Sequence, residues 1–413
     1  MARVRMRFFQ CLTAQAVNGI PEVGGISGPN EWDLSVNLAR ALSVNTLATP
    51  VRGPARYATR RHEARLLACL LTGAAGATSA TRRLSLDAAF PASARHIRGF
   101  VSESAGLGLL TVAAEELFRW RADPALIEHF DALPTSLVPR YGTNGSRPDL
   151  LFNFGIGLGL LAGEAKGRSR KPPTKVLVQQ VKALNKLLRW SHDNHDHPIV
   201  LSFAFLTNQG TTVDLFSIAP GPRSPVRDLL LRQGKADWIA ETVSPDPQHD
   251  EAIALARQDA AHARESDRIE DTDMDEEVRR VVPEQDISVE DFEAEAIGRA
   301  GEIENQLYAD ASQLLREDAT SRYPLMGTSV VGSWMPLNLF AERRRYLFFG
   351  TLDHKLTADA ISRFERGRDD RQVENRTIDI DIDITSRLVV AITTQPTASP
   401  PAWESVKENV ERG

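Results

Sequence analysis

The chain has 413 residues, of which 42% are hydrophobic and 25% are charged, values typical of a soluble globular protein with room for two or three domains. Its two cysteines exclude a disulfide framework and a zinc site built from cysteines, which fits the reducing cytoplasm. The basic N-terminus is not followed by an apolar core, and no apolar run is long enough to cross a bilayer. We therefore expect a cytoplasmic protein without a signal peptide and without a membrane partner.

The net charge of −6 is unevenly distributed along the chain. Residues 265–304 hold 16 acidic and 4 basic residues, a local charge of −12, so the rest of the chain carries +6. Residues 166–189 hold eight basic residues and no acidic one. Such a run can bind a phosphate backbone, although a solvated helix face with a basic loop has the same pattern. We expect the acidic segment to cover the basic one until a partner or DNA displaces it.

Residues 1–108 are expected to form a mainly helical N-terminal region. Apolar residues recur at helical spacing in 61–71, and again in 109–120 at the start of the next region. Proline and glycine residues predict loops at 19–30 and 49–54.

Residues 109–220 have a different pattern and are expected to form the core of the protein. They read as two strands joined by a glycine-containing turn, then an amphipathic helix, then strands at 199–207 and 212–218. Three further segments are expected to follow: a helical extension at 221–264, an acidic linker or exposed helix at 265–304, and an α+β C-terminal module at 305–413.

The C-terminal module contains a run, 377–384, in which isoleucine and aspartate alternate. A period of two places the isoleucines on one face of a strand and the aspartates on the other. The pattern favours a half-buried strand with a solvated acidic face over a cation site formed by the aligned aspartates.

Two short runs in the core, 145–152 and 160–167, carry the residues with chemical potential. If they pair as an antiparallel hairpin with Asp149 opposite Glu164, the turn falls on the glycine-rich segment 155–159. Strand alternation then places Lys166 on the same face as Glu164. Two carboxylates and an ammonium group therefore converge.

This grouping suits hydrolysis of a phosphodiester bond. Asp149 and Glu164, with the Ala165 carbonyl as a third oxygen ligand, suit a hard cation such as Mg²⁺, with Mn²⁺ as a substitute. The cation would lower the pKa of a water molecule and stabilise charge on the phosphoryl oxygens. Lys166 can orient or deprotonate the attacking water.

The combination of Pro148-Asp149, a hairpin, Glu164-x-Lys166 and a following helix resembles the PD-(D/E)xK superfamily of restriction-endonuclease-like enzymes. The resemblance covers roughly residues 109–218. It implies an α/β fold with an αβββαβ core around a mixed central sheet. It also implies that Asp149 and Glu164 bind metal and that Lys166 assists catalysis.

Many members of this superfamily also carry a glutamine on the helix after the lysine. Gln179 and Gln180 are the candidates here. The expected buried stripe of this helix comprises Leu177, Val181, Leu184 and Leu188. Because Gln180 flanks this stripe, we favour Gln180 as the residue that faces the site, with a solvated glutamine as the alternative. Some members add an acid from the preceding helix, where Glu116 is better placed than Glu115.

The residues expected to bind nucleic acid are the basic residues that follow the hairpin. They are Arg168, Arg170, Lys171, Lys175, Lys182 and Lys186. A rival triplet, 353–355, has the sequence Asp-His-Lys but lacks a partner carboxylate on a preceding hairpin strand. Three histidines within 192–197 could bind zinc, although surface histidines are the commoner explanation of such a loop.

The sequence thus favours a Mg²⁺-dependent endonuclease that acts on DNA, in restriction or phage defence. RNA stays open as the substrate, and a homodimer or a larger defence complex is the expected assembly. The alternative is a catalytically silent subunit of the same fold that binds nucleic acid or supports assembly. In a third reading, the motif is accidental in an unrelated α+β protein. The DNA preference and the defence role follow from the resemblance alone.

Overall fold

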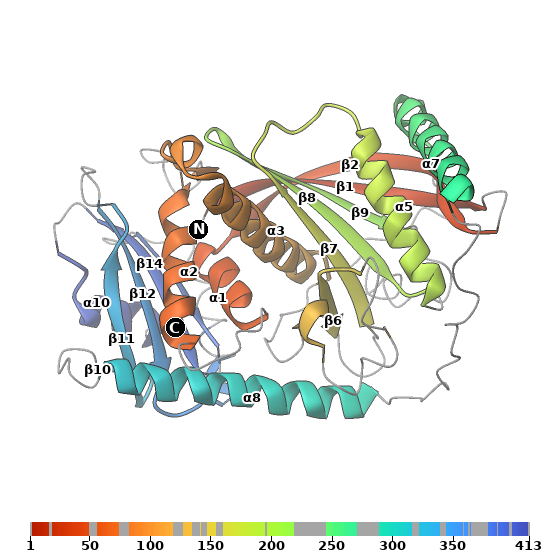
Figure 1. Ribbon diagram of the computed structural model, residues 1–413. Helices are drawn as coiled ribbons and strands as arrows, with labels where there is room; N and C mark the ends of the chain where they lie inside the picture. The colour runs from red at the N-terminus through yellow and green to blue at the C-terminus, as the bar shows by residue number, and fades with distance from the viewer. Residues whose placement is uncertain are drawn as a thin grey trace.

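The computed structural model describes most of the chain. The described residues are 2–15, 19–48, 56–73, 82–118, 127–133, 141, 147–153, 160–194, 196–218, 245–270, 289–315, 322–338, 344–357, 359–361, 364, 379–385, 387–395 and 399–411. The fold is mixed α/β, with a large mixed sheet at its centre (Figure 1).

The central sheet has seven strands in the order β2-β1-β9-β8-β7-β6-β5. Their bounds are β1 (Ala2–Gln15), β2 (Pro21–Val36), β5 (Ile127–His129), β6 (Leu150–Asn153), β7 (Leu160–Arg168), β8 (Ile199–Thr207) and β9 (Gly210–Ile218). The pairs β1–β9 and β7–β8 are parallel and the other neighbours are antiparallel. The near-continuous apolar sequence of β8 suits its place inside the sheet, where both of its faces are buried.

Helices cover both faces of this sheet (Figure 1). On one side lie α1 (Leu38–Ala48), α2 (Arg56–Leu70) and α3 (Arg95–Phe118), and on the other lie α5 (Val178–Asp193) and α7 (Asp250–Glu270). A hydrophobic core lies on each face of the sheet, and alternate residues of β6 contribute to the two cores. Leu150 and Phe152 pack in the core with α3, and Leu151 packs in the core with α5. The expected apolar stripe of α5 is confirmed at Val181 and Leu184.

A second, five-stranded sheet forms the C-terminal module. It is antiparallel throughout, in the order β10-β11-β12-β14-β13. Its strands are β10 (Arg322–Leu325), β11 (Thr328–Pro336), β12 (Arg344–Leu352), β13 (Asp379–Ile384) and β14 (Leu388–Gln395). One face shares a core with α1, α2 and α8 (Val289–Leu314), and the other is covered by α10 (Trp403–Glu411). The layer of α1–α3 therefore lies between the two sheets (Figure 1).

The fold also contains several short elements. They are the two-stranded ribbon of β3 (Leu71–Gly73) and β4 (Leu84–Leu86), and the 3-10 turns η2 (Phe90–Ala92), η4 (Phe130–Ala132) and η6 (Pro247–His249). No helix in the described part of the chain is long and apolar enough to span a membrane.

The N-terminal region is not the mainly helical one that we expected. It contributes β1 and β2, the two longest strands, and β2 occupies residues predicted as a loop. Because β1 pairs with β9, the expected boundary at 108 separates strands of one sheet and cuts through α3. The missed signal is the alternation in β1, where Val4, Met6 and Phe8 are buried between arginines.

The acidic face of β13 also differs from the expectation, because Asp383 is buried and Asp381 is half-buried. Asp383 is 1% exposed and lies 3.5 Å from Arg40 of α1, while Asp381 accepts a hydrogen bond of 3.3 Å from the Leu38 backbone N–H. The isoleucine face is buried as predicted. Sequence pattern alone does not reveal that a helix more than 330 residues earlier in the chain covers the aspartates.

The predicted linker is only partly within the described residues. Helix α7 runs on to Glu270, and α8 begins at Val289. Residues 219–244, which include the start of the predicted helical extension, and residues 271–288 of the acidic segment lie outside the described residues.

Candidate active site

The hairpin of β6 and β7 has the register that the sequence predicts. Leu150 pairs with Gly163 and Asn153 pairs with Leu160, which places Asp149 opposite Glu164. The Asp149 backbone N–H also donates a hydrogen bond of 3.0 Å to the carbonyl of Gly163. The glycine-rich residues 154–159 lie outside the described residues.

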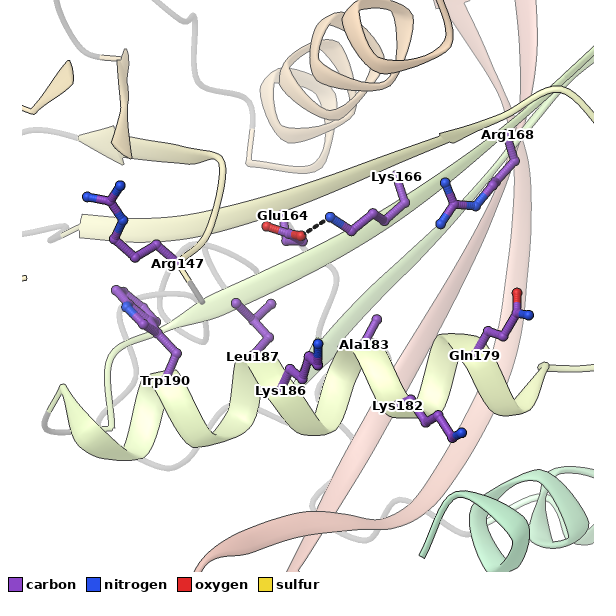
Figure 2. Close-up of a pocket in the computed structure, with 10 residues that line it drawn as sticks. All are labelled: Arg147, Glu164, Lys166, Arg168, Gln179, Lys182, Ala183, Lys186, Leu187 and Trp190. Carbon is purple, nitrogen blue, oxygen red and sulfur yellow. Dashed lines mark ion pairs between the residues drawn. The ribbon is translucent and has the colours of Figure 1, made fainter. Parts of the chain in front are cut away.

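Glu164 and Lys166 lie on the face of β7 that looks toward α5, and they form an ion pair (Figure 2). Their side chains are 14% and 33% exposed. Across the hairpin, a carboxylate oxygen of Asp149 accepts a hydrogen bond of 2.7 Å from the Ala165 N–H. This bond holds the Asp149 carboxylate against the strand that carries the other two groups.

The electrostatic state of Glu164 is unusual. Its pKa is raised to about 7, first by burial and then by the negative charge of Asp149, while the ammonium group of Lys166 opposes the shift. One of its carboxylate oxygens, Oε2, is buried without a hydrogen-bond partner. A buried acceptor without a partner is unfavourable, and a cation bound there would satisfy it and offset the repulsion between the two carboxylates.

A cavity of about 500 Å³ opens between β7 and α5 beside this pair (Figure 2). It is lined by Arg147, Glu164, Lys166, Arg168, Gln179, Lys182, Ala183, Lys186, Leu187 and Trp190. Five of these residues are basic and one is acidic. The cavity therefore favours an anionic ligand next to the carboxylates.

Three of the six residues predicted to bind nucleic acid line this cavity: Arg168, Lys182 and Lys186. The other three are exposed on the segment that connects β7 to α5. They are Arg170, Lys171 and Lys175, and the guanidinium of Arg170 lies 5.9 Å from the ring centre of Phe205. Lys182 also pairs at 2.6 Å with Asp259 of α7, just ahead of the acidic segment.

Gln180 does not face the carboxylates, so our preference for it over Gln179 is corrected. Its side chain is 1% exposed, donates a hydrogen bond of 2.9 Å to Asp214 and accepts one of 2.8 Å from the Leu177 N–H. Gln179 lines the cavity instead. The helical wheel correctly placed Gln180 on the flank of the buried stripe, but it could not show the polar partner beneath it.

That partner belongs to a buried polar network which links the sheet to the start of α5. Arg7 of β1 binds both carboxylate oxygens of Asp214 of β9, at 2.6 and 2.7 Å, and donates to the carbonyl of Pro173 at 2.7 Å. Burial raises the pKa of Asp214, although the hydrogen bonds from Arg7 and Gln180 oppose the shift. The network ties the helix that carries the cavity lysines to two strands.

Arg147 and Trp190 of the cavity wall were given no role from the sequence, and Gln179 was ranked below Gln180. Arg147 stands two residues before Asp149, and its guanidinium is held at 3.0 Å by Asp131. Its position two residues before Asp149 was the feature of the sequence that could have identified Arg147 as part of the site. The contribution of Trp190 depends on the packing of α5 against the sheet, which no local pattern reports.

The close approach of α3 to β7 fixes the back of the site. A Cβ atom at Gly167 would lie 1.7 Å from the carbonyl oxygen of Ser102, and one at Gly106 would lie 3.0 Å from the Gly167 nitrogen. Only glycines allow the two backbones to come this close. The contact with α3 therefore fixes the position of the β7 backbone directly after Lys166.

The other candidates from the sequence have different surroundings. His197 is buried and hydrogen-bonds Tyr141 at 2.9 Å, and His195 lies outside the described residues. In the rival triplet, Asp353 bonds Tyr308 at 3.0 Å on the C-terminal module. Glu116, the proposed extra acid, is exposed on α3. Within the described ranges, no cluster of three or more histidine, cysteine, aspartate or glutamate residues could hold a metal.

The residues at the hairpin nevertheless fit a hard divalent cation. Two carboxylates lie on neighbouring strands, and one buried oxygen of Glu164 has no partner. The third oxygen that we predicted is the backbone carbonyl of Ala165 rather than a side chain. Such an oxygen-only donor set suits Mg²⁺ or Mn²⁺.

Comparison with protein-family models, with curated proteins and with solved structures found no match for this chain.

Proposed function

We propose that the protein is a metal-dependent nuclease of the PD-(D/E)xK kind. The observation that carries the proposal is the hairpin that places Asp149 opposite Glu164, which lines a basic cavity together with Lys166. The chain order α3-β5-β6-β7-α5-β8 adds support, because it follows the αβββαβ order that the resemblance implies. The family assignment rests on these features of the chain itself.

The proposed cation ligands are the carboxylates of Asp149 and Glu164 and the carbonyl of Ala165. A divalent cation held there would supply Lewis acidity toward a water nucleophile and positive charge next to the phosphoryl oxygens. The raised pKa of Glu164 means that this side chain must lose a proton before it can act as a ligand.

The surrounding side chains have separate roles in this proposal. Lys166 donates a hydrogen bond to the attacking water or to a phosphoryl oxygen, which orients the water and offsets the charge that develops in the transition state. Arg168, Lys182 and Lys186 bind the phosphates on either side of the scissile bond. Gln179 lies on the same wall and can donate a hydrogen bond to the backbone of the substrate.

The biological setting of the proposal comes from the resemblance. We propose DNA as the polymer, restriction or phage defence as the role, the cytoplasm as the compartment, and a homodimer or larger defence complex as the assembly. Two free cysteines, Cys11 and Cys69, are in keeping with a reducing compartment.

A catalytically silent subunit of the same fold is the second candidate. The observation that favours it is the small number of acidic ligands, because only two carboxylates converge on the site among the described residues. Such a subunit would bind nucleic acid through the same basic cavity and would not cleave it.

Cleavage of plasmid and single-stranded DNA with Mg²⁺ or Mn²⁺ tests the proposal. The wild type should cut, and the Lys166→Ala and Asp149→Ala variants and EDTA should abolish the activity. The matched control is Lys355→Ala in the rival triplet, which should cut like the wild type. Equal cutting by wild type and both site variants would refute the assignment. Salt-sensitive binding without cutting would establish the silent subunit instead.

A further inference from the structure

The cavity beside the ion pair contains an apolar strip as well as cations. Ala183, Leu187 and Trp190 follow one another along the face of α5 that looks toward β7 (Figure 2). Their spacing of four and three residues keeps them on one side of the helix. Lys186 lies beside this strip, and Lys182 also lines the cavity while its ammonium group pairs with Asp259 of α7. The helix thus presents an apolar row and a cationic row to the same space.

Trp190 stands at one end of the apolar strip, near Arg147 (Figure 2). Neighbouring rings hold it in place: Tyr141 stacks on it with centres 5.9 Å apart, and Phe130 meets it edge-on at 5.4 Å. It is 7% exposed, and its indole nitrogen Nε1 has no hydrogen-bond partner. His197 also meets the ring edge-on at 5.3 Å, so the exposed part of the indole that a ligand can contact is carbon surface and not the enclosed Nε1.

The two rows match the two parts of a nucleotide. Phosphates fit the cationic row, whereas the apolar faces of a nucleobase fit the row of Ala183, Leu187 and Trp190. In a duplex the bases are stacked inside the helix, and only the phosphates and groove edges would reach α5. A cavity of about 500 Å³ is within the usual range for a small organic ligand.

We propose that this cavity binds one unpaired nucleotide, with its base against Leu187 and Trp190 and its phosphate between Lys166 and the α5 lysines. The inference rests on the proposed nuclease site, and it narrows the substrate to single-stranded nucleic acid, ends or flipped nucleotides. Trp190 then acts as a residue that determines specificity, because it distinguishes a strand with accessible bases from a duplex.

Binding measured in EDTA tests the inference without requiring cleavage. The probes are a 12-nucleotide thymidine strand, a 12-unit strand of abasic deoxyribose phosphates with the same charge, and a thymidine–adenosine duplex of the same length. Wild type should bind the thymidine strand more tightly than the duplex and about 5- to 100-fold more tightly than the abasic strand, the range expected for base–aromatic contacts. A uridine 12-mer shows whether RNA is also a source of the nucleotide, and base dependence with either polymer supports the inference.

Two variants locate the base. Trp190→Leu should reduce the preference for bases toward onefold, and Trp190→Phe, which keeps the ring packing, should give an intermediate ratio. Trp334→Leu on the C-terminal module is the matched control and should keep the wild-type ratio. Thermal melting shows whether each variant is folded. If Trp190→Leu is not folded, the binding ratio of Trp190→Phe tests the inference.

Equal affinity of the wild type for the thymidine and abasic strands would overturn the inference, as would a base preference that the Trp190 variants leave intact. Tighter binding of the duplex, or no binding to any probe, would also overturn it. None of these results decides the nuclease proposal, because that proposal depends on the cleavage assay with Lys166→Ala and Asp149→Ala.

Discussion

Replacing Gly167 by alanine should separate the strand that carries Lys166 from the helix behind it. The added Cβ would lie 1.7 Å from the Ser102 carbonyl oxygen, whereas Cβ contacts in real structures essentially never fall below 3.0 Å. The backbones of α3 and β7 must therefore move apart by at least 1.3 Å. The atoms that the added Cβ would meet belong to the backbone of Ser102 and Glu103, so no flexible side chain can move aside instead.

Two effects of this movement can be predicted in size. Overpacking of this kind costs about 1–3 kcal/mol, and we expect the upper end because backbone meets backbone. Displacement of Lys166 by roughly 1 Å should lower the cleavage rate by about 100-fold. Denaturant titration measures the first effect, and plasmid cleavage at saturating Mg²⁺ measures the second.

Two glycines of the facing helix, α3, serve as controls. Gly99→Ala, where no atom lies within 4 Å of the added Cβ, should be neutral or more stable by up to about 1 kcal/mol. Gly106→Ala, with a contact of 3.0 Å, should fall between the two. If Gly167→Ala matched the wild type in both stability and cleavage, the claim that this contact fixes the site would be refuted.

Three other predictions follow from the site's charges. Glu164 holds its proton more tightly in the folded chain, so its contribution to stability is present below its ordinary pKa of 4.5 and is lost as the pH rises through about 7. The affinity for a divalent cation should therefore increase as the pH rises through 7. In denaturant titrations, the free energy of unfolding of Glu164→Gln should exceed that of the wild type by an amount that grows from pH 5 to pH 8. An affinity and a stability difference that do not change with pH would contradict this prediction. Asp259→Asn should free Lys182 to contact a phosphate, so the slope of log affinity for DNA against log salt concentration should steepen by about one unit. The free energy of unfolding should change by less than about 1 kcal/mol. An unchanged slope would argue against a phosphate contact by Lys182. Arg7→Met should destabilise the fold by about 3–5 kcal/mol, because it leaves the Asp214 carboxylate buried without its cation. The double variant Arg7→Met with Asp214→Leu should lose much less stability. Equal losses of stability in the single and double variants would show that the pair acts only through packing.

Local pattern was sufficient to predict the hairpin that carries the site. The register of Asp149 against Glu164 depends on strand alternation and on glycines between the two runs, and both are local properties of the sequence. The limits of β8 and the buried stripe of α5 were predicted for the same reason, because the first depends on a continuous apolar run and the second on the helical period of apolar residues.

Features that depend on distant partners could not be predicted in the same way. The side chain of Gln180 is directed by Asp214, and the aspartates of β13 are covered by α1, which lies at the other end of the chain. The strand β1 was missed for a different reason. Its alternation of apolar residues and arginines is visible, but we assigned that stretch to a mainly helical region.

Binding of Mn²⁺ at pH 8, followed by electron paramagnetic resonance, tests most directly whether Asp149 and Glu164 form a metal-dependent active site. We expect the wild type and the control Asp353→Asn, in the rival triplet, to bind the ion, and we expect Asp149→Asn and Glu164→Gln each to lose that binding. Mn²⁺ binding that persists in both site variants, or its absence in the wild type, would contradict the proposed metal centre.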